Sequence, residues 1–478
     1  MQNILIICER EMKTIFFLLL SFITLNAQSY QQEIMKGNFT RAAKMIDSII
    51  INNQLTPTDR YDLNFEKDRM DRIRLDFNKT RDDILPYIKK FYPEVNDQLL
   101  AEWEKDNSLE HMIIDGEKKY FSRSASNLFL INKKAKERKR EITGAVKDNL
   151  DEFLLKDLPE VIKNSETENS TLVNPVKYKL TYTISVDANA VPEGEIIRCW
   201  LPYPREGNRR QTDVKLISAN GKYLIADNEN LQRTVYMEKT AVKDQKAEFK
   251  IELGYTAYSE WFNVEPAKIK EYNAASEEYK TFTAERAPHI VFTSEIKQLS
   301  DKIVGSEKNP YLKARLIYEW INDNIPWAGA REYSTLQCIP AYSLQNKHGD
   351  CGIKTLLFMT LARYNGIPAR WQSGWMLHPV EVNLHDWAEA YFEGYGWVPV
   401  DQSFGIQQSD NQKIKYYYLG GMDSYRLIVN DDYTQPLYPA KIYPRSETVD
   451  FQRGELEWRG GNLYFNKWDY DMEVEYVE

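Results

Sequence analysis

The sequence is short of positive charge, of cysteine and of histidine, and each shortage excludes a class of protein. Its 62 Lys and Arg residues face 71 Asp and Glu residues, which gives a net charge of −9. Because nucleic-acid-binding proteins normally present a basic surface, we expect no nucleic-acid partner. Four cysteines in 478 residues are too few for a disulfide framework. With five histidines and no Cys-x-x-Cys spacing, we also expect no metal site and no cofactor.

The sequence also lacks a hydrophobic run that could span a bilayer. The run IFFLLLSFITL at 15–25 falls short of the roughly 20 apolar residues that a membrane helix needs. Met12 and Lys13 precede it and the small residue Ala27 follows it, which is typical of a secretory signal. We therefore predict a signal peptide at Met12–Ala27, an upstream extension before it, and a secreted or periplasmic protein with no membrane span after signal removal. A buried N-terminal helix is the alternative.

The composition is that of a globular protein, with 42% hydrophobic and 28% charged residues. At about 150 residues per domain, the length predicts about three domains. The first domain, at 28–165, is predicted to be helical because Ala42, Ile46 and Ile49 recur at helical spacing. Asp115-Gly116 within it predicts the turn of a hairpin.

A second domain, at 175–265, is predicted to be a β-sandwich. It follows the polar residues 164–174, which predict a linker. Segments 196–201 and 248–255 alternate apolar and polar residues as half-buried strands do, and several such strands favour a sandwich. Cys199 lies within one of them and is interpreted as an inert core residue. The same alternation is found in the first segment of the domain, at Tyr178, Leu180, Tyr182, Ile184 and Val186.

The segment that carries chemistry begins at Cys351. Asp350 is a typical N-cap, and an apolar stripe at helical spacing follows from Ile353 until Asn365-Gly366 ends the helix. Cys351 therefore lies at a helix N-terminus, where the unpaired N–H groups and the helix dipole favour the nucleophilic thiolate. Asp350 acts in the opposite direction, because its negative charge raises the pKa of the thiol.

Two further residues complete a Cys-His-Asp set by residue type. His385 lies in a predicted strand at 384–392, and Asp401 ends the predicted return strand after a glycine-containing turn. A tight turn that pairs Phe392 with Trp397 would place Asp401 on the wrong face of the sheet. Pairing Tyr391 with Trp397 instead places Asp401 diagonally beside His385, within side-chain reach. The triad hypothesis therefore requires the longer loop or a bulge.

This segment resembles the core of the transglutaminase-like superfamily. The resemblance is carried, in the right order, by G-x-C at a helix start, L-x-R-x-x-G-I-P-A-R, H-x-W-x-E and G-W-x-P-x-D. It implies an α+β fold, with a papain-like catalytic domain and a C-terminal extension at 266–478, after the β-sandwich and the helical N-terminal domain. It also implies that Cys351 is the nucleophile, His385 the base and Asp401 the acid that orients the base.

Other residues near this segment are candidates for smaller roles. By family resemblance, the backbone N–H of Cys351 is the first oxyanion donor, and the second is either the indole of Trp327 or the amide of Gln345. Trp387 is a candidate for substrate binding because it shares a strand face with His385. The remaining residues considered have no partner motif and are interpreted as structural: His289, His348, His378 and Cys338.

Three functions remain open at this stage. The first is hydrolysis of a peptide or amide bond outside the cytoplasm, with a peptide, a protein or a peptidoglycan-like amide as substrate. The second is protein-glutamine transglutamination, which shares the acyl-enzyme step and differs in its acceptor. The third is a catalytically silent envelope protein that binds peptide or glycan in an aromatic cleft. The residues of the triad do not distinguish the first two functions, because hydrolysis and transamidation use the same nucleophile.

Overall fold

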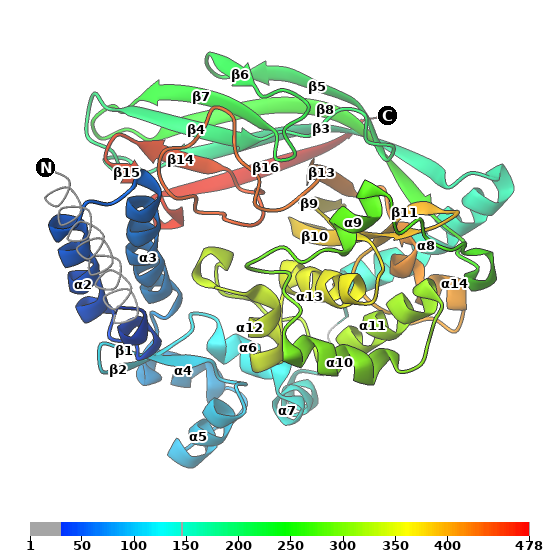
Figure 1. Ribbon diagram of the computed structural model, residues 1–478, viewed down its shortest axis with the longest axis horizontal. Helices are drawn as coiled ribbons and strands as arrows, with labels where there is room; N and C mark the ends of the chain where they lie inside the picture. Colours follow the sequence, from blue (N-terminus) through cyan, green and yellow to red (C-terminus); the bar gives the residue numbers. More distant parts are fainter. Residues whose placement is uncertain (1–29, 145–146, 478) are drawn as a thin grey trace, which may run out of the picture. The chain divides into compact units, whose positions relative to one another are not determined.

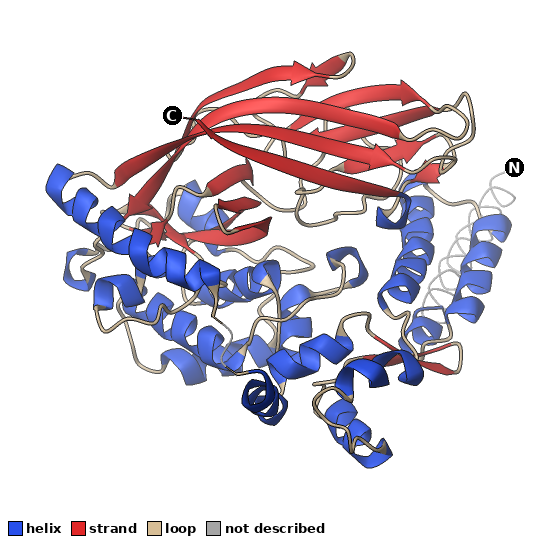
Figure 2. Ribbon diagram, turned by 180° about the vertical axis from the view of Figure 1, so that it is seen from behind, coloured by secondary structure: helices blue, strands red, loops and turns tan. Residues whose placement is uncertain are grey.

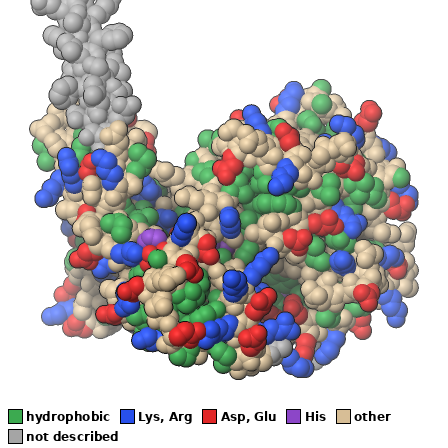
Figure 3. Space-filling view, turned by 90° about the horizontal axis from the view of Figure 1, so that it is seen from below, with side chains coloured by type: hydrophobic (Ala, Val, Ile, Leu, Met, Phe, Trp, Pro, Cys, Tyr) green, Lys and Arg blue, Asp and Glu red, His purple; other side chains and the backbone are tan. Residues whose placement is uncertain are grey.

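The computed structural model describes residues 30–144 and 147–477, and the chain divides into two compact units, Met1–Ala135 and Lys136–Glu478. The predicted signal peptide at Met12–Ala27 lies outside the described residues. Among the residues that are described, no helix is long and apolar enough to cross a membrane. On the face of the molecule shown in Figure 3, acidic and basic side chains are interspersed.

The first unit is helical, as the spacing of its apolar residues predicts. Thr56 and Thr80 each begin a helix with a capping box, in which the threonine hydroxyl and an aspartate three residues later satisfy the first N–H groups. Ala42, Ile46 and Ile49 are buried on one face of their helix. The elements are α2 (Phe39–Asn52), α3 (Pro57–Asp76), α4 (Arg81–Ile88), α5 (Asp97–Lys105), β1 (His111–Ile114), β2 (Glu117–Tyr120), α6 (Ser124–Ile131) and α7 (Lys133–Thr143), the last of which runs into the second unit.

The hairpin predicted in this unit is confirmed. Strands β1 and β2 pair with Ile114 opposite Glu117, so that Asp115 and Gly116 alone form the turn. Both turn residues have positive φ, which is the conformation that Asp-Gly favours in a two-residue hairpin. The unit has two hydrophobic clusters of its own, one around Ile46 and Ile73 and one around Ile88 and Leu128.

The second unit begins with α8 (Asn149–Glu168), and strand β3 starts only three residues after it. The prediction of a linker at 164–174 is therefore wrong, because the segment forms the last turns of α8 and the start of β3. Its polar residues are used locally instead of remaining solvated. Asn169 closes the helix in the left-handed conformation, and Ser165 Oγ donates to the carbonyl of Ser170 at 2.6 Å.

Two antiparallel sheets form the sandwich (Figures 1 and 2). One has the strand order β12-β8-β3-β16 with β5 also paired to β8, and the other has the order β15-β14-β4-β7-β6. All five alternating residues predicted for the first strand are buried, and Cys199 lies in the same core. The strands are β3 (Leu172–Val186), β4 (Ile196–Pro202), β5 (Gln211–Ala219), β6 (Tyr223–Ile225), β7 (Thr234–Thr240), β8 (Ala247–Trp261), β12 (Gly421–Met422), β14 (Glu455–Trp458), β15 (Gly461–Asn462) and β16 (Trp468–Val477).

The C-terminal segment belongs to this sandwich in space. Strand β14 pairs with β4, and β16 pairs with β3 from Trp468 opposite Val186 to Val477 opposite Lys177. The sandwich therefore uses strands from before and after the central part of the chain. The domain limits expected from the sequence stay a prediction. Strands that follow residue 265 also contribute to these two sheets.

Between these strands in the sequence lies a small four-stranded sheet of order β11-β10-β9-β13 with helices around it. Helix α13 contacts β9 and β10 as well as α10, α11 and α12, and nearly all of its residues are buried. The α+β fold class is confirmed. The elements are α9 (Glu277–Thr283), α10 (Ser294–Val304), α11 (Pro310–Asn324), α12 (Ile339–Asn346), α13 (Cys351–Tyr364), β9 (Ala369–His378), β10 (Glu381–Phe392), β11 (Gly396–Val400), α14 (Gln412–Lys415) and β13 (Arg426–Asn430).

Candidate active site

Cys351 is the first residue of helix α13, as the sequence predicts. The carboxylate of Asp350 caps the helix by accepting the N–H of Ile353 at 3.2 Å. The first N–H groups of a helix have no partner inside the helix, and the N–H groups of Cys351 and Gly352 take no other acceptor among residues 30–144 and 147–477. Cys351 is itself partly exposed. The helix start therefore places the thiol of a partly exposed residue beside two backbone donors.

Strand register brings His385 and Asp401 together. Tyr391 lies opposite Trp397 and Ala388 opposite Val400, which is the longer-loop register that the triad hypothesis requires. His385 Nε2 lies 2.7 Å from Asp401 Oδ2, so the ring donates Nε2–H to the carboxylate. That bond leaves Nδ1 of His385 as the unprotonated nitrogen. The predicted His-Asp contact is thus present, and it depends on where the β10–β11 turn begins.

The carboxylate of Asp401 is held in its charged form although it is completely buried. Burial raises its pKa, but His385 and Arg426 outweigh this and lower the pKa overall. Arg426 Nη1 lies 3.1 Å from Oδ2, and the N–H groups of Ser403 and Phe404 donate to Oδ1. For His385, burial is the largest effect and lowers the pKa, although Asp401 acts against it. The imidazole is therefore neutral and poised as a base.

The thiol of Cys351 makes its hydrogen bond to Asp386 and not to His385. Its Sγ lies 3.2 Å from Asp386 Oδ2, and no hydrogen bond joins Cys351 to His385 in the described part of the chain. Neighbouring residues of a strand point to opposite faces, so the side chains of His385 and Asp386 point away from each other. Strand β11 pairs with β10 only as far as Ala388, which leaves the edge of β10 open at this point. The contact between Cys351 and His385 stays a prediction.

The surroundings of the sulfur favour its neutral form. Burial raises the pKa of the Cys351 thiol well above its ordinary value, and the charges of Asp386 and Asp350 raise it further. The direction expected for Asp350 from the sequence is confirmed. The backbone N–H of Asp386 acts the other way and lowers the thiol pKa. Deprotonation of Cys351 therefore needs a base that is close when the reaction starts.

The remaining candidates lie in different environments. Trp327 is 47% exposed and its backbone pairs with Gly349, two residues before Cys351. Gln345 is exposed on α12. Trp387 is fully buried with its indole N–H donated to Gln372 at 2.9 Å, and its ring stacks on that of His385. Trp327 is thus the one of the three with an exposed aromatic side chain, and its backbone lies beside the residue two before Cys351, whereas the ring of Trp387 stacks on that of His385.

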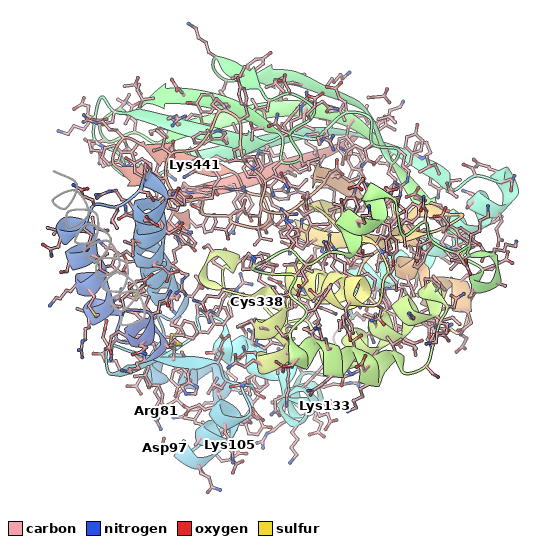
Figure 4. All side chains as sticks on the ribbon, viewed as in Figure 1. Arg81, Asp97, Lys105, Lys133, Cys338 and Lys441 are labelled. Atoms are coloured by element: carbon pink, nitrogen blue, oxygen red, sulfur yellow. The ribbon has the colours of Figure 1, made fainter. Side chains whose placement is uncertain are left out.

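The cysteines and histidines interpreted as structural are placed as follows. Cys199 is fully buried in β4. Cys338 lies directly before α12 (Figure 4), where its Sγ–H donates to the carbonyl of His289 at 3.8 Å. Burial lowers the pKa of both His289 and His348 to about 4, so these two rings are neutral.

Sequence reasoning missed four charged residues around the site. Arg426 on β13 lies between Asp401 and Asp423, and Asp423 in turn lies 3.1 Å from His378 Nε2. Asp386 contacts the thiol. Lys354 is 4% exposed one helical turn after Cys351, and burial lowers its pKa to about 8. Its i+3 spacing from Cys351 was a usable signal, whereas Arg426 is remote in the sequence.

One motif residue has a structural role that the structure makes plain. Glu389, the last residue of H-x-W-x-E, is fully buried and ion-paired with Arg209 at 2.8 Å and Arg370 at 2.6 Å. Burial raises its pKa, but Arg370 and Arg209 outweigh this and lower it to about 2. Within the described residues, no group of three or more His, Cys, Asp or Glu side chains is arranged to hold a metal.

Comparison with known proteins identifies the class. Residues 297–402 match the transglutaminase-like superfamily, and this stretch contains Cys351, His385 and Asp401. The match covers the central part of the chain and supports the resemblance to that superfamily.

Individual relatives give the match its context. An uncharacterized protein of Haemophilus influenzae is 27% identical over 311 residues, which cover 55% of this chain and 81% of that protein. Among solved structures, a candidate cysteine protease from Cytophaga hutchinsonii aligns with 14% identity and a TM-score of 0.43 over 64% of this chain and 92% of that one. The periplasmic domain of TgpA from Pseudomonas aeruginosa aligns with 13% identity and a TM-score of 0.23 over 49% and 90%. Because these TM-scores are low, the resemblance to the superfamily rests on the sequence match.

Proposed function

We propose that this chain is a thiol-dependent acyl-transfer enzyme in which Cys351 is the nucleophile, His385 the base and Asp401 the residue that orients the base. The observation that carries the proposal is the His385–Asp401 pair at 2.7 Å. His385 lies on β10, and the residue that follows it, Asp386, contacts the thiol at the start of α13. The backbone N–H of Asp386 also acts on the thiol, and this N–H belongs to the peptide bond that joins Asp386 to His385.

The reaction begins when Sγ of Cys351 gives up its proton to Nδ1 of His385. The thiolate attacks the carbonyl carbon of an amide, and the N–H groups of Cys351 and Gly352 donate hydrogen bonds to the negative carbonyl oxygen that develops. The imidazolium then returns its proton to the leaving amine, which leaves a thioester on Cys351. Asp401 stabilises the imidazolium, and Arg426 keeps Asp401 ionised throughout.

We propose hydrolysis as the completing step, with water activated by His385 attacking the thioester. A peptide, a protein or a peptidoglycan-like amide is the proposed substrate class, and the exposed indole of Trp327 is the proposed contact for such a substrate. The proposed location is outside the cytoplasm, on the strength of the signal pattern at Met12–Ala27. Transglutamination uses the same thioester with an amine as acceptor, and it is the outcome to be distinguished by experiment.

The test is to incubate the protein with candidate peptide and cell-wall amide substrates and to search for a thioester on Cys351 by mass spectrometry after acid quenching. We expect the adduct on Cys351, and none after Cys351→Ala. Cys338→Ala is the matched control, because Cys338 is also partly exposed and lies on the neighbouring α12 segment. The same reactions with a fluorescent primary amine separate the two acceptors, since only transamidation would attach the amine to the substrate.

A catalytically silent binding protein predicts a different result. It would bind a peptide or glycan without forming an adduct, and Cys351 would react with electrophiles no faster than Cys338. Adducts on both cysteines at equal rates, or turnover that survives Cys351→Ala, would contradict the proposal.

A further inference from the structure

The contact between Cys351 and Asp386 is not explained by a Cys-His-Asp triad. Asp386 is 1% exposed, and in the described part of the chain it forms no ion pair with a lysine, arginine or histidine. The charged groups that act on it most strongly are Asp350 and Glu447, which are both acidic. A buried carboxyl group beside other carboxyl groups, without a cation, is more stable with its proton.

The hydrogen bonds around Asp386 fit a protonated carboxyl group. Oδ1 accepts the side-chain N–H of Gln452 at 2.8 Å, and the same amide also donates to the carbonyl of His385 at 2.8 Å. Oδ2 faces two atoms, the hydroxyl oxygen of Tyr333 at 3.4 Å and Sγ of Cys351 at 3.2 Å. The proton of Tyr333 is used elsewhere, since it is donated to Asp350 Oδ1 at 2.6 Å. While the thiol keeps its proton, Sγ donates to Oδ2; once the sulfur is a thiolate, a protonated Oδ2 is placed to donate to it.

A glycine makes this arrangement possible. A Cβ atom on Gly352 would lie 2.3 Å from the Tyr333 hydroxyl and 2.7 Å from Asp386 Oδ2. Both distances are shorter than any real side chain tolerates, so Gly352 lets the two polar groups approach the start of α13. The groups converge on the end of the helix that carries the thiol.

We infer that Asp386 is a catalytic residue, a neutral carboxylic acid that donates a hydrogen bond from Oδ2 to the sulfur of Cys351. The inference deepens the proposed function and rests on it. When His385 takes the thiol proton, the new thiolate would otherwise lie between Asp350 and Asp386 with no side-chain donor. The proton stays on Asp386 throughout, so the carboxyl group stabilises the thiolate by hydrogen bonding and adds no negative charge beside it. Burial and the neighbouring acids raise the pKa of Asp386 well above its ordinary value, which supports this state.

The experiment measures the rate at which iodoacetamide alkylates Cys351, followed by mass spectrometry from pH 5 to pH 10, in the full chain. It needs no substrate. Asp386→Asn keeps the shape and an N–H donor, so its rate should stay within a few-fold of the wild type. Asp386→Ala removes the donor, and losing a hydrogen bond to a charged group should slow alkylation by about tenfold or more and raise the apparent thiol pKa. Asp450→Asn is the matched control, because Asp450 is also a buried carboxyl that acts on Asp386 without contacting the sulfur.

An ionised Asp386 predicts the opposite pattern. Its negative charge would repel the thiolate, so Asp386→Asn would react faster than the wild type and show a lower thiol pKa. That result, or equal rates in all variants, would overturn the inference. If Asp386→Ala does not fold, the infrared difference spectrum between the wild type and Asp386→Asn decides the question, since a protonated carboxyl band must be lost in the variant.

Failure of this inference can be told apart from failure of the proposed function. His385→Ala and Cys351→Ala test the triad through turnover, whereas the Asp386 variants are compared through thiol reactivity alone. A triad that passes its test together with faster alkylation of Asp386→Asn would remove only the role given to Asp386.

Discussion

The protonation state of each aspartate in this site is set by the charged groups that surround it in the buried interior. Asp401 stays ionised because it faces His385 and Arg426, and Asp386 favours its proton because it faces Asp350 and Glu447. Both are buried aspartates in or beside strands of the same sheet. Their different neighbours give one the role of an anion and the other the role of a donor, which is how a protein separates the tasks of two like groups.

Arg426→Met tests this control at the residue scale. Arg426 is 2% exposed and is the cation between Asp401 and Asp423, so its loss leaves two buried carboxylates with weaker partners. We expect the pKa values of Asp401 and His385 to rise, because the arginine lowers both. The acid limb of kcat/KM should therefore move to higher pH, and the free energy of unfolding should fall by about 3–5 kcal/mol.

The pH profile of turnover and thermal melting measure these two effects. Arg426→Lys keeps a positive charge and should restore most of the position of the acid limb. An unchanged acid limb in a folded Arg426→Met variant would mean that Arg426 has no influence on the His385–Asp401 pair.

At the scale of secondary-structure elements, a few short-range features of the sequence position the site. Helix α13 starts at Cys351 because Asp350 caps it, and the β10–β11 turn sets the register that joins His385 to Asp401. These features are short-range, and the sequence predicted them. The roles of β14 and β16 in the sandwich depend on pairing across more than 200 positions of the chain, which no local pattern specifies.

The residues that were missed follow the same division. Arg426 lies beside Asp401 because β13 pairs with β9, and these two strands are well separated in the sequence. Gln452, which holds Asp386, comes from the segment before β14. Asp386 directly follows His385, but it lies on the opposite face of the strand from the motif residues His385, Trp387 and Glu389. The alternation of the strand therefore gave no reason to select Asp386. The predicted linker at 164–174 failed for a different reason, since polar residues also cap helices and begin strands.

Helix α8 gives a prediction at the scale of an element. Burial raises the pKa of Asp157 to about 7, with Asp423 and Glu160 adding to the rise. Its Oδ2 has no hydrogen-bond partner among the described residues. A raised carboxyl pKa means that the folded state holds a proton that the unfolded chain has already lost. Stability from this group is therefore complete at low pH and is lost as the pH rises toward about 7.

Asp157→Asn removes this loss, because the amide is neutral at every pH. We expect the variant to be more stable than the wild type by about 1–3 kcal/mol at pH 8, and nearly equal to it at pH 4. Urea unfolding at the two pH values measures the difference. A stabilisation that is the same at both values would show that Asp157 does not titrate as described.

At the scale of the whole molecule, the candidate site belongs to one of the two units. Cys351, His385, Asp401, Asp386 and Arg426 all lie in Lys136–Glu478, together with the sandwich and the small sheet. The first unit has its own hydrophobic clusters and its own capped helices. Each unit thus has the core that an independently folding domain requires.

A chain limited to residues 136–478 should therefore fold and keep a reactive Cys351. We expect cooperative melting and an iodoacetamide alkylation rate within a few-fold of that of the full chain. Circular dichroism and mass spectrometry measure the two properties. A folded fragment whose Cys351 has lost its reactivity would show that the first unit contributes to the site.

The most direct test of the central claim is turnover by Cys351→Ala, His385→Ala and the double variant, measured beside thermal melting on any amide substrate that the wild type accepts. If the two residues act as one unit, each single change removes nearly all turnover, and the double change costs little more. Melting should barely change at Cys351, which is partly exposed, whereas Cys199→Ala should lower stability by about 1 kcal/mol or more because Cys199 is fully buried. Turnover per folded molecule that survives Cys351→Ala, or losses from the single changes that simply multiply in the double variant, would contradict the claim.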